Sequence, residues 1–315
     1  MVDPAAERLQ AILRQLEQAG RFALPMPGAG ATAERHRALY EFGREDLSVA
    51  RLAEAHTDAL AILAEAGAAS ISGSLYGVWA SDGPHSRLSG ERSADGGISL
   101  SGTKLYCSGA PILDAALVTV HCGQGLWLVA LPLDTNGVRI EPGGWATPAF
   151  AATGTSRVIF EAVHATPAQI IGGPNWYLER IGFWRGAIGP AACWAGGAAG
   201  LVDAARLLGR DDPHSRAHLG ALEATVWGLQ ALLDQAGLQI DVAADNPRQA
   251  QRRALIVRHL VERGCVEVLE RFGRATGPQL LAFDAAVARR HAELTLYIRQ
   301  CHAERDLEDI PLPRR

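Results

Sequence analysis

Two glycine-bearing segments of the sequence combine aromatic and hydroxyl side chains: YGVWASDGP over Tyr76 to Pro84, and SGTKLYCSGA over Ser101 to Ala110. The second segment follows the run GGISL and precedes the alternation ALVTV, which predicts a strand, a tight bend and another strand. Glycine-rich turns at strand ends present backbone N–H groups beside a flat apolar face. A planar ring with a polar edge requires such a surface, so the two segments are a candidate ring-binding platform.

Other motifs have simpler structural explanations. GAGATA at 28–33 has the spacing of a dinucleotide fingerprint, but it follows Pro-Met-Pro rather than a strand. AGGAAG at 195–200 lies in an apolar helical context, where small residues let two helices approach closely. His214 and His218 are four residues apart without an obvious third ligand, so we expect no metal site. Neither a G-x-S-x-G elbow nor a Walker loop occurs.

Composition excludes several classes of protein. The chain has 315 residues, is 48% hydrophobic and 20% charged, and carries a formal net charge of -4 without a basic cluster, which argues against nucleic acid as a partner. Five cysteines without a C-x-x-C pair favour a reducing cytoplasm over a disulfide or zinc framework. No apolar run of about 18 residues and no signal-like start occur, so we expect no membrane span. The single lysine, Lys104, is interpreted as part of a general bias toward arginine.

The first half of the chain changes from a helical period to a strand period. Apolar spacing predicts a helix over 3–19, a Pro- and Gly-rich loop over 22–33, and a long helix over 45–67. Between 70 and 173, alternating and β-branched runs separated by turn residues predict a β domain. The runs ALVTVHC and LWLVALPL are joined by Gly123-Gln124-Gly125, which predicts a hairpin.

The helical period returns after Gly173, in four long runs over 176–209, 214–237, 247–273 and 280–306. Short connections between long helices are typical of an antiparallel bundle. The sequence therefore predicts an α+β fold with an N-terminal helical part (1–69), a middle β domain (70–173) and a C-terminal four-helix bundle (174–315). This order excludes the regular β-α-β alternation of a doubly wound sheet.

From about Leu47 almost to the C-terminus, the order and spacing of several stretches resemble the acyl-CoA dehydrogenase family of flavoproteins. These stretches are DLSVARLAEAHTDAL, YGVWASDGP, LSGTKLYCSGAPILDAALVTV, GTSRVIFEAVHAT, LERFGRATG and the terminal ERDL. The resemblance implies a three-part fold that encloses FAD. The N-terminal helical part of this chain is shorter than is usual in that family.

The resemblance also implies a set of cofactor-binding residues. Both platform segments would lie against the flavin ring and hydrogen-bond its edge, and Arg210 would reach the FAD diphosphate, although Pro213-His214 replaces the Phe-Gly that usually follows it. The run FGRATG at 272–277 would correspond, with one residue more, to the family's Phe-Gly-x-x-Gly turn near the dinucleotide of a neighbouring subunit, and a helix C-cap explains Gly277 equally well. The implied residues are Tyr76, Val78, Trp79, Ser81, Tyr106, Cys107, Ser108, Arg210, Phe272 and Gly273.

The carboxylate required for dehydrogenation is missing from the positions where the resemblance would place it. Proton abstraction beside a thioester carbonyl needs a glutamate opposite the flavin, usually in a late Tyr-Glu-Gly-Thr motif. The matching segment is LYIRQCH, so one family position falls near Arg299, and the alternative position falls near Pro190. Three nearby carboxylates are interpreted as solvated or ion-paired, and we assign no catalytic base; they are Glu179, Glu293 and Glu304.

Three functions therefore remain open. The first is an FAD-dependent, acyl-CoA dehydrogenase-like oxidoreductase that acts on CH–CH bonds of an acyl thioester. The second is a related flavin monooxygenase, which needs no such glutamate and in which His302 would be a polar group near the ring. The third is a catalytically inactive scaffold or a heteromeric subunit whose partner supplies the base. The resemblance further implies a homodimer or homotetramer.

Overall fold

The computed structural model describes residues 3–83, 86–243 and 246–310, so Pro84, the last residue of the first platform segment, lies outside the described residues. The chain divides into two compact units, each built from two stretches of sequence. The first unit comprises Met1–Ala23 and Ala55–Phe183, and the second comprises Leu24–Glu54 and Trp184–Arg315. One boundary between the units lies between Ala23 and Leu24, and the other two fall within the helices α3 (Leu47–Glu65) and α5 (Ile181–Gly186).

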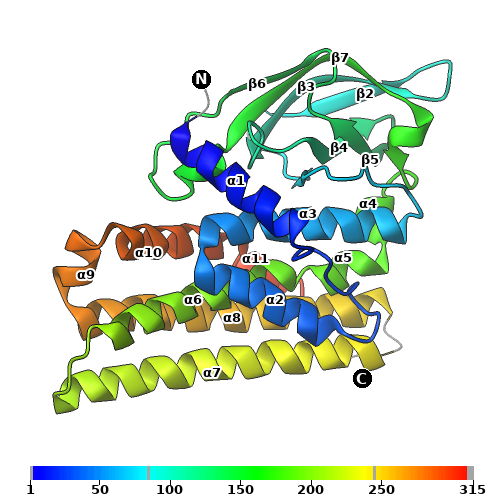
Figure 1. The fold of residues 1–315 in the computed structure, drawn as a ribbon. Helices are drawn as coiled ribbons and strands as arrows, with labels where there is room; N and C mark the ends of the chain where they lie inside the picture. The colour runs from blue at the N-terminus through cyan, green and yellow to red at the C-terminus, as the bar shows by residue number, and fades with distance from the viewer. Residues whose placement is uncertain (1–2, 84–85, 244–245, 311–315) are drawn as a thin grey trace. The chain divides into compact units, whose positions relative to one another are not determined.

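The first unit contains a mixed sheet, which has eight strands among the described residues (Figure 1). The strand order is β6-β7-β3-β2-β4-β5-β8, with β1 paired to β4 outside this path. β4 pairs in parallel with β1 and β2, whereas the other pairs are antiparallel. The strands are β1 (Tyr76–Trp79), β2 (Leu88–Arg92), β3 (Ile98–Cys107), β4 (Ala115–Cys122), β5 (Gly125–Pro132), β6 (Val138–Pro142), β7 (Ser156–Ala165) and β8 (Ile170–Ile171).

The core of the first unit forms where β-branched and leucine-rich strands meet the second half of α3. Ala59, Ile62 and Leu63 of that helix pack with Tyr76 of β1 and with buried residues of β4, β5 and β8. The predicted hairpin is confirmed, because β4 and β5 pair antiparallel from Ala115↔Pro132 to Cys122↔Gly125. The remaining helical elements of this unit are α1 (Pro4–Gln18), η1 (Ala151–Thr153), η2 (Pro167–Gln169) and α4 (Trp176–Glu179).

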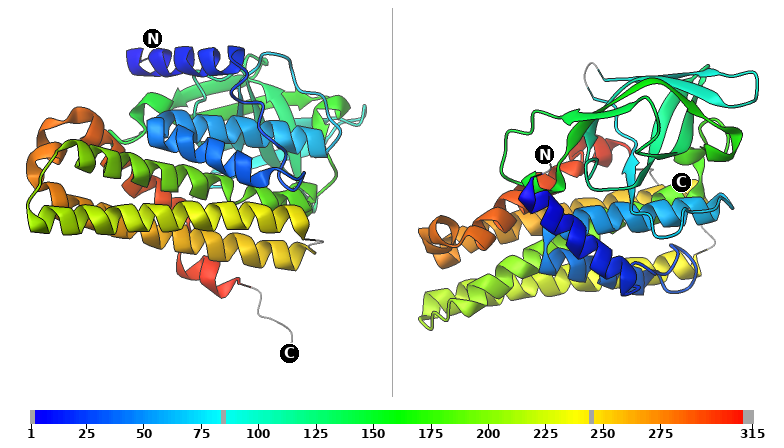
Figure 2. Two further views of the ribbon diagram at one scale, coloured as in Figure 1. Left: turned by 60° about the horizontal axis from the view of Figure 1, so that its bottom comes forward. Right: turned by 45° about the horizontal axis from the view of Figure 1, so that its top comes forward.

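The second unit is helical, and its longest helices begin at recognisable capping residues. Asp212 caps α7 and Asn246 caps α8, each followed by proline at the first helical position. Figure 2 shows α7 and α8 side by side along most of their length. The helices are α2 (Thr32–Glu45), α6 (Gly189–Leu207), α7 (Pro213–Val242), α8 (Pro247–Thr276), α9 (Pro278–Phe283), α10 (Ala285–Tyr297), η3 (Ile298–Gln300) and α11 (Glu304–Glu308).

Small residues of α6 allow its close packing, as the run AGGAAG predicts. A Cβ added to Gly196 would overlap the carbonyl oxygen of Tyr40 in α2, and one added to Gly43 of α2 would overlap the carbonyl oxygen of Cys193. α6 is buried almost all round over its first half. Its backbone therefore contacts the backbone of α2 directly.

The α+β class is confirmed, with differences in the helical parts. Helix α2 was not predicted from the sequence, and the predicted helix over 176–209 is divided into α4, α5 and α6. The run over 280–306 is likewise divided into α9, α10, η3 and the start of α11. The boundaries 1–69, 70–173 and 174–315 stay a prediction of the domain layout. No helix in the described part of the chain is both long and apolar enough to cross a membrane.

Candidate functional site

The structure brings the two predicted platform segments together within the first unit. The first comprises β1 and the turn after it, and the second comprises the end of β3 and the turn before β4. Trp79 at the end of β1 donates a hydrogen bond from Nε1 to the carbonyl oxygen of Ser108, at 3.2 Å. A Cβ added to Gly83 would lie 3.1 Å from Leu105 and 3.3 Å from the ring of Tyr106. The two segments therefore form one continuous surface.

Tyr106 is the most unusual residue of this surface. Its φ is 60°, in the left-handed region that non-glycine residues rarely adopt, and 54% of it is exposed. Holding tyrosine in this conformation costs about 1 kcal/mol or more. Residues held at such a backbone cost cluster at binding and active sites, so Tyr106 is a candidate ligand contact.

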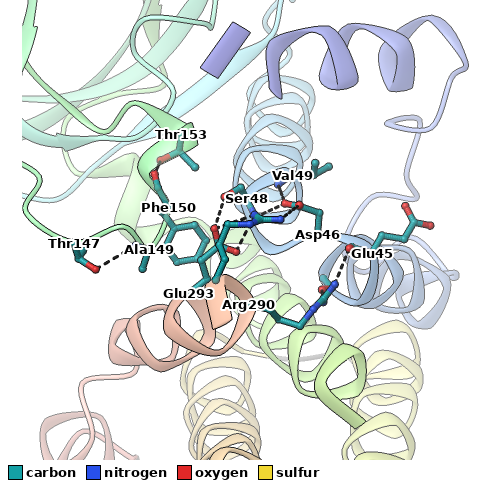
Figure 3. Close-up of polar contacts among 12 residues, drawn as sticks. Glu45, Asp46, Ser48, Val49, Thr147, Ala149, Phe150, Thr153, Arg290 and Glu293 are labelled. Carbon is teal, nitrogen blue, oxygen red and sulfur yellow. Dashed lines mark hydrogen bonds and ion pairs between the residues drawn. The ribbon is translucent and has the colours of Figure 1, made fainter. Parts of the chain in front are cut away.

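A row of hydroxyl groups lies behind the second segment. The hydroxyl of Ser108 shares a hydrogen bond of 3.1 Å with that of Thr155, which lies 3.0 Å from that of Thr153. Thr153 donates to the carbonyl oxygen of Phe150 at 2.8 Å, a contact drawn in Figure 3. Because each hydroxyl has one proton, Thr155 then donates to Thr153, and Ser108 donates to Thr155. Neither threonine was predicted as a site residue from the sequence, although the motif GTSRVIFEAVHAT contains Thr155.

The side chains of the other platform residues differ in how far they are exposed to solvent. The side chain of Tyr76 is buried in the core, where its hydroxyl accepts a hydrogen bond from the Ile71 N–H. Cys107 is also fully buried, and burial raises the pKa of its thiol to about 12. Val78 is half-buried, whereas Ser81 is exposed. A ligand on the surface would therefore meet Ser81, Tyr106 and backbone groups rather than the side chains of Tyr76 and Cys107.

The predicted dinucleotide-binding residues come together in the second unit. Arg210, in the loop between α6 and α7, donates hydrogen bonds of 3.1 Å to the carbonyl oxygens of Ala275 and Thr276 at the end of α8. Phe272 is buried one turn earlier, and a Cβ on Gly273 would meet open space. The guanidinium of Arg210 thus caps the C-terminal end of α8, where a positive charge is favourable.

Glu293 of α10 is a buried carboxylate in the second unit, with a side chain only 1% exposed (Figure 3). Ser48 donates to it at 2.7 Å, and Arg289 lies 3.2 Å away. Burial raises the pKa of Glu293, and the pull of Arg289 only partly offsets this. Of the two interpretations that the sequence left open, solvated or ion-paired, the structure supports the second, because Glu293 is ion-paired with Arg289 and faces the N-terminal turn of α3.

The two positions that the family resemblance assigns to a base hold no carboxylate, and the other two candidate glutamates are exposed. Arg299 donates to Glu262 at 2.6 Å, and Pro190 is in the first turn of α6. Glu179 and Glu304 are exposed. His302 is also exposed, with Nδ1 3.2 Å from Asp306. Among the described residues, no cluster of histidine, cysteine or carboxylate side chains could hold a metal ion.

No protein-family model and no curated protein matches the chain. Solved structures are similar over nearly its whole length. The methanesulfinate monooxygenase of Pseudomonas fluorescens is 18% identical, with a TM-score of 0.78, over 100% of this chain and 99% of that one. The dibenzothiophene monooxygenase of Paenibacillus sp. A11-2 is 17% identical, with a TM-score of 0.77, over 97% and 95%. Other structures of that enzyme contain FMN, alone or with indole.

A nitrososynthase from Micromonospora carbonacea var. africana is 17% identical, with a TM-score of 0.78, over 97% of this chain and 92% of that one. At these identities the likeness shows the fold, which is acyl-CoA dehydrogenase-like.

Proposed function

We propose that this chain is a flavin-dependent monooxygenase that uses FMN to oxygenate a small molecule. The observation that carries the proposal is the similarity of the fold, over nearly the whole chain, to two monooxygenases, one of which has been solved with FMN. The substrates in their names contain sulfur, and the nitrososynthase is named for a nitrogen product. We therefore propose a substrate with an oxidisable sulfur, nitrogen or aromatic carbon.

The platform fits a flavin ring. Tyr106 offers an exposed aromatic face, and Ser81 offers an exposed hydroxyl. Because Gly83 has no side chain, the first segment can lie close to the ring of Tyr106. The hydrogen bond from Trp79 to Ser108 fixes the two segments relative to each other before any ligand binds. Residues from both segments would hold the ring and its polar edge.

The positions of the carboxylates favour this proposal over acyl-CoA dehydrogenation. The two positions that the family resemblance assigns to a base hold Arg299, which is paired with Glu262, and Pro190. Glu293 is engaged by Ser48 and Arg289. A monooxygenase needs no carboxylate for abstraction of an α-proton. FMN, when bound in its reduced form, supplies two electrons, so that one atom of O₂ enters the substrate and the other leaves as water.

The identity of the flavin and the assembly state belong to the same proposal. The family resemblance implies FAD, whereas the similar structures solved with a flavin support FMN. Arg210, the residue expected at the FAD diphosphate, already donates hydrogen bonds to the backbone carbonyl oxygens of Ala275 and Thr276. A homodimer or homotetramer stays a prediction from the family resemblance, and light scattering of the purified chain tests it.

The test begins with titration of the purified protein with FMN and FAD, followed by single-turnover oxidation. The FMN-loaded protein is reduced without oxygen and then mixed with isotopically labelled O₂ and indole, dibenzothiophene or methanesulfinate. We expect labelled oxygen in a product, detected by mass spectrometry, and none when free reduced FMN replaces the protein.

Acyl-CoA thioesters, added without oxygen to the FMN-loaded protein, test the alternative that the chain is a dehydrogenase. If an acyl-CoA bleached the bound flavin without oxygen, the chain would be a dehydrogenase and the proposal would be wrong. Flavin binding without either reaction would indicate a scaffold or an incomplete heteromer. Failure to bind FMN or FAD would remove the platform as a flavin site.

A further inference from the structure

The only lysine of the chain is buried beneath the first platform segment. Lys104 of β3 is 0% exposed. Its ammonium group donates to Asp82 Oδ1 at 2.7 Å, to Thr119 Oγ1 at 2.8 Å and more weakly to the Ser81 carbonyl oxygen at 3.4 Å. An ammonium has three protons, and three oxygens surround this one. The residue is therefore a fully used donor rather than a surface charge.

Asp82 makes the burial of this charge possible. A buried ammonium is costly unless a carboxylate or several acceptors face it. The second oxygen of Asp82 accepts a hydrogen bond of 2.7 Å from His121 Nε2, so both oxygens of the carboxylate are held. Burial opposes ionisation of Asp82, but the bonds from His121 and Lys104 outweigh it and lower the pKa of the carboxyl.

The side chains of Lys104, Thr119 and His121 hold residues 80–82, which lie beyond the backbone pairing of β1 with β4. The pairing of β1 with β4 ends at Trp79↔Val118. Beyond it, Thr119 donates to the carbonyl oxygen of Ala80 at 3.0 Å, and Lys104 and His121 hold Asp82. Side chains of β3 and β4 therefore fix the course of residues 80–82, which carry Ser81.

We propose that Lys104 is a positioning residue that holds residues 80–82 where Ser81 and the adjacent backbone can contact the flavin ring. This inference rests on the proposed flavin site. It assigns Lys104 a role through its contacts with residues 80–82 rather than through contact with the ligand. Tyr106, two residues after Lys104 in the same strand, would contact the same ring from the second segment. One buried ammonium thus connects the first segment to the strand that carries the second.

Lys104→Met removes the ammonium and keeps most of the side-chain volume, while Asp82 keeps its bond to His121. We expect FMN binding about tenfold weaker and a changed shape of the visible absorption band of bound flavin. In the protein without flavin, amide hydrogen exchange over 75–83 should be faster, with β5 unchanged. Leu100→Val, a change of a buried residue in the same strand, controls for loss of stability alone and should leave both measurements as in the wild type.

Wild-type FMN affinity, spectrum and exchange in Lys104→Met would overturn the inference. If that variant does not fold, His121→Gln weakens the hold on Asp82 more gently and should produce smaller changes in the same direction; unchanged exchange over 75–83 in that variant would also overturn it. If the wild type binds no flavin, the proposed function fails. The exchange measurement then still decides whether Lys104 positions the segment.

Discussion

Gly196 of α6 and Tyr40 of α2 lie so close together that a Cβ on the glycine would overlap the tyrosine carbonyl oxygen. Gly43 of α2 stands in the same relationship to Cys193 of α6. Because the obstructing atoms belong to backbone, no side-chain rotation could relieve the overlap. The two helices would have to move apart.

We therefore expect Gly196→Ala to lower the free energy of unfolding by about 3 kcal/mol, through overpacking that separates α2 from α6. Gly220→Ala is the matched control in α7, because no atom beyond its chain neighbours and the surrounding helix backbone lies within 4 Å of its added Cβ. That control should raise stability by about 0.5–1 kcal/mol, since alanine is the better helix former. Urea unfolding followed by circular dichroism measures both, and equal effects would contradict the direct backbone contact.

Local signals in the sequence were sufficient for the parts of the fold that depend on neighbouring residues. The glycines between β4 and β5 predicted the hairpin, and AGGAAG predicted close helix packing. α2 was missed because its polar residues resemble those of a solvated segment. In the structure Arg35 and His36 are buried, and each side chain contacts a backbone carbonyl oxygen, of Pro25 and Leu233 respectively.

Long-range partners explain what could not be predicted at the candidate site. The two platform segments could be found because each contains its own glycine, aromatic and hydroxyl residues. The burial of Lys104 depends on Asp82 and Thr119, and that of Glu293 depends on Ser48, which is 245 residues away in sequence. Nothing local in the sequence distinguishes these charged residues from solvated ones.

Tyr106→Gly should separate ligand binding from stability. Glycine adopts a φ of 60° without strain, so we expect the unfolding temperature of the flavin-free protein to be maintained or raised. Loss of the aromatic face should weaken FMN binding by up to about tenfold, the value of one stacking interaction. Tyr106→Phe keeps the ring and should keep the affinity. Wild-type FMN affinity in Tyr106→Gly would remove this residue from the flavin site.

Arg210→Ala tests whether the bound cofactor is FMN, which has a single phosphate, or FAD, whose diphosphate Arg210 was predicted to contact. Its guanidinium is bonded to the carbonyl oxygens of Ala275 and Thr276, so we expect a small loss of stability at the end of α8 and unchanged FMN affinity. Arg216→Ala, which removes an exposed arginine paired with Asp211, is the control. Titrations with both flavins provide the measurement. A selective loss of FAD affinity in Arg210→Ala would instead support FAD and the predicted diphosphate contact.

Glu293→Gln should change the dependence of stability on pH. Burial raises the pKa of this carboxyl above 4.5, so its protonated form favours the folded state. The contribution is present below the ordinary pKa and is lost as pH rises through the folded-state value. Each tenfold tightening of proton binding corresponds to about 1.4 kcal/mol. The glutamine variant lacks this loss, and we expect it to gain stability relative to the wild type as pH rises.

The comparison between the wild type and Glu293→Gln also removes the effect of Asp46 on the pH dependence of stability, which is opposite to that of Glu293. Arg289 and the N–H groups of Val49 and Ser48 overcome burial and lower the pKa of Asp46, so its contribution is lost as pH falls. Asp46 is present in both proteins, and its effect largely cancels in their difference. Urea unfolding between pH 4 and pH 8 measures this difference. A difference that does not vary with pH would show that Glu293 is ionised in the folded protein at no cost, and that Ser48 and Arg289 fully compensate its burial.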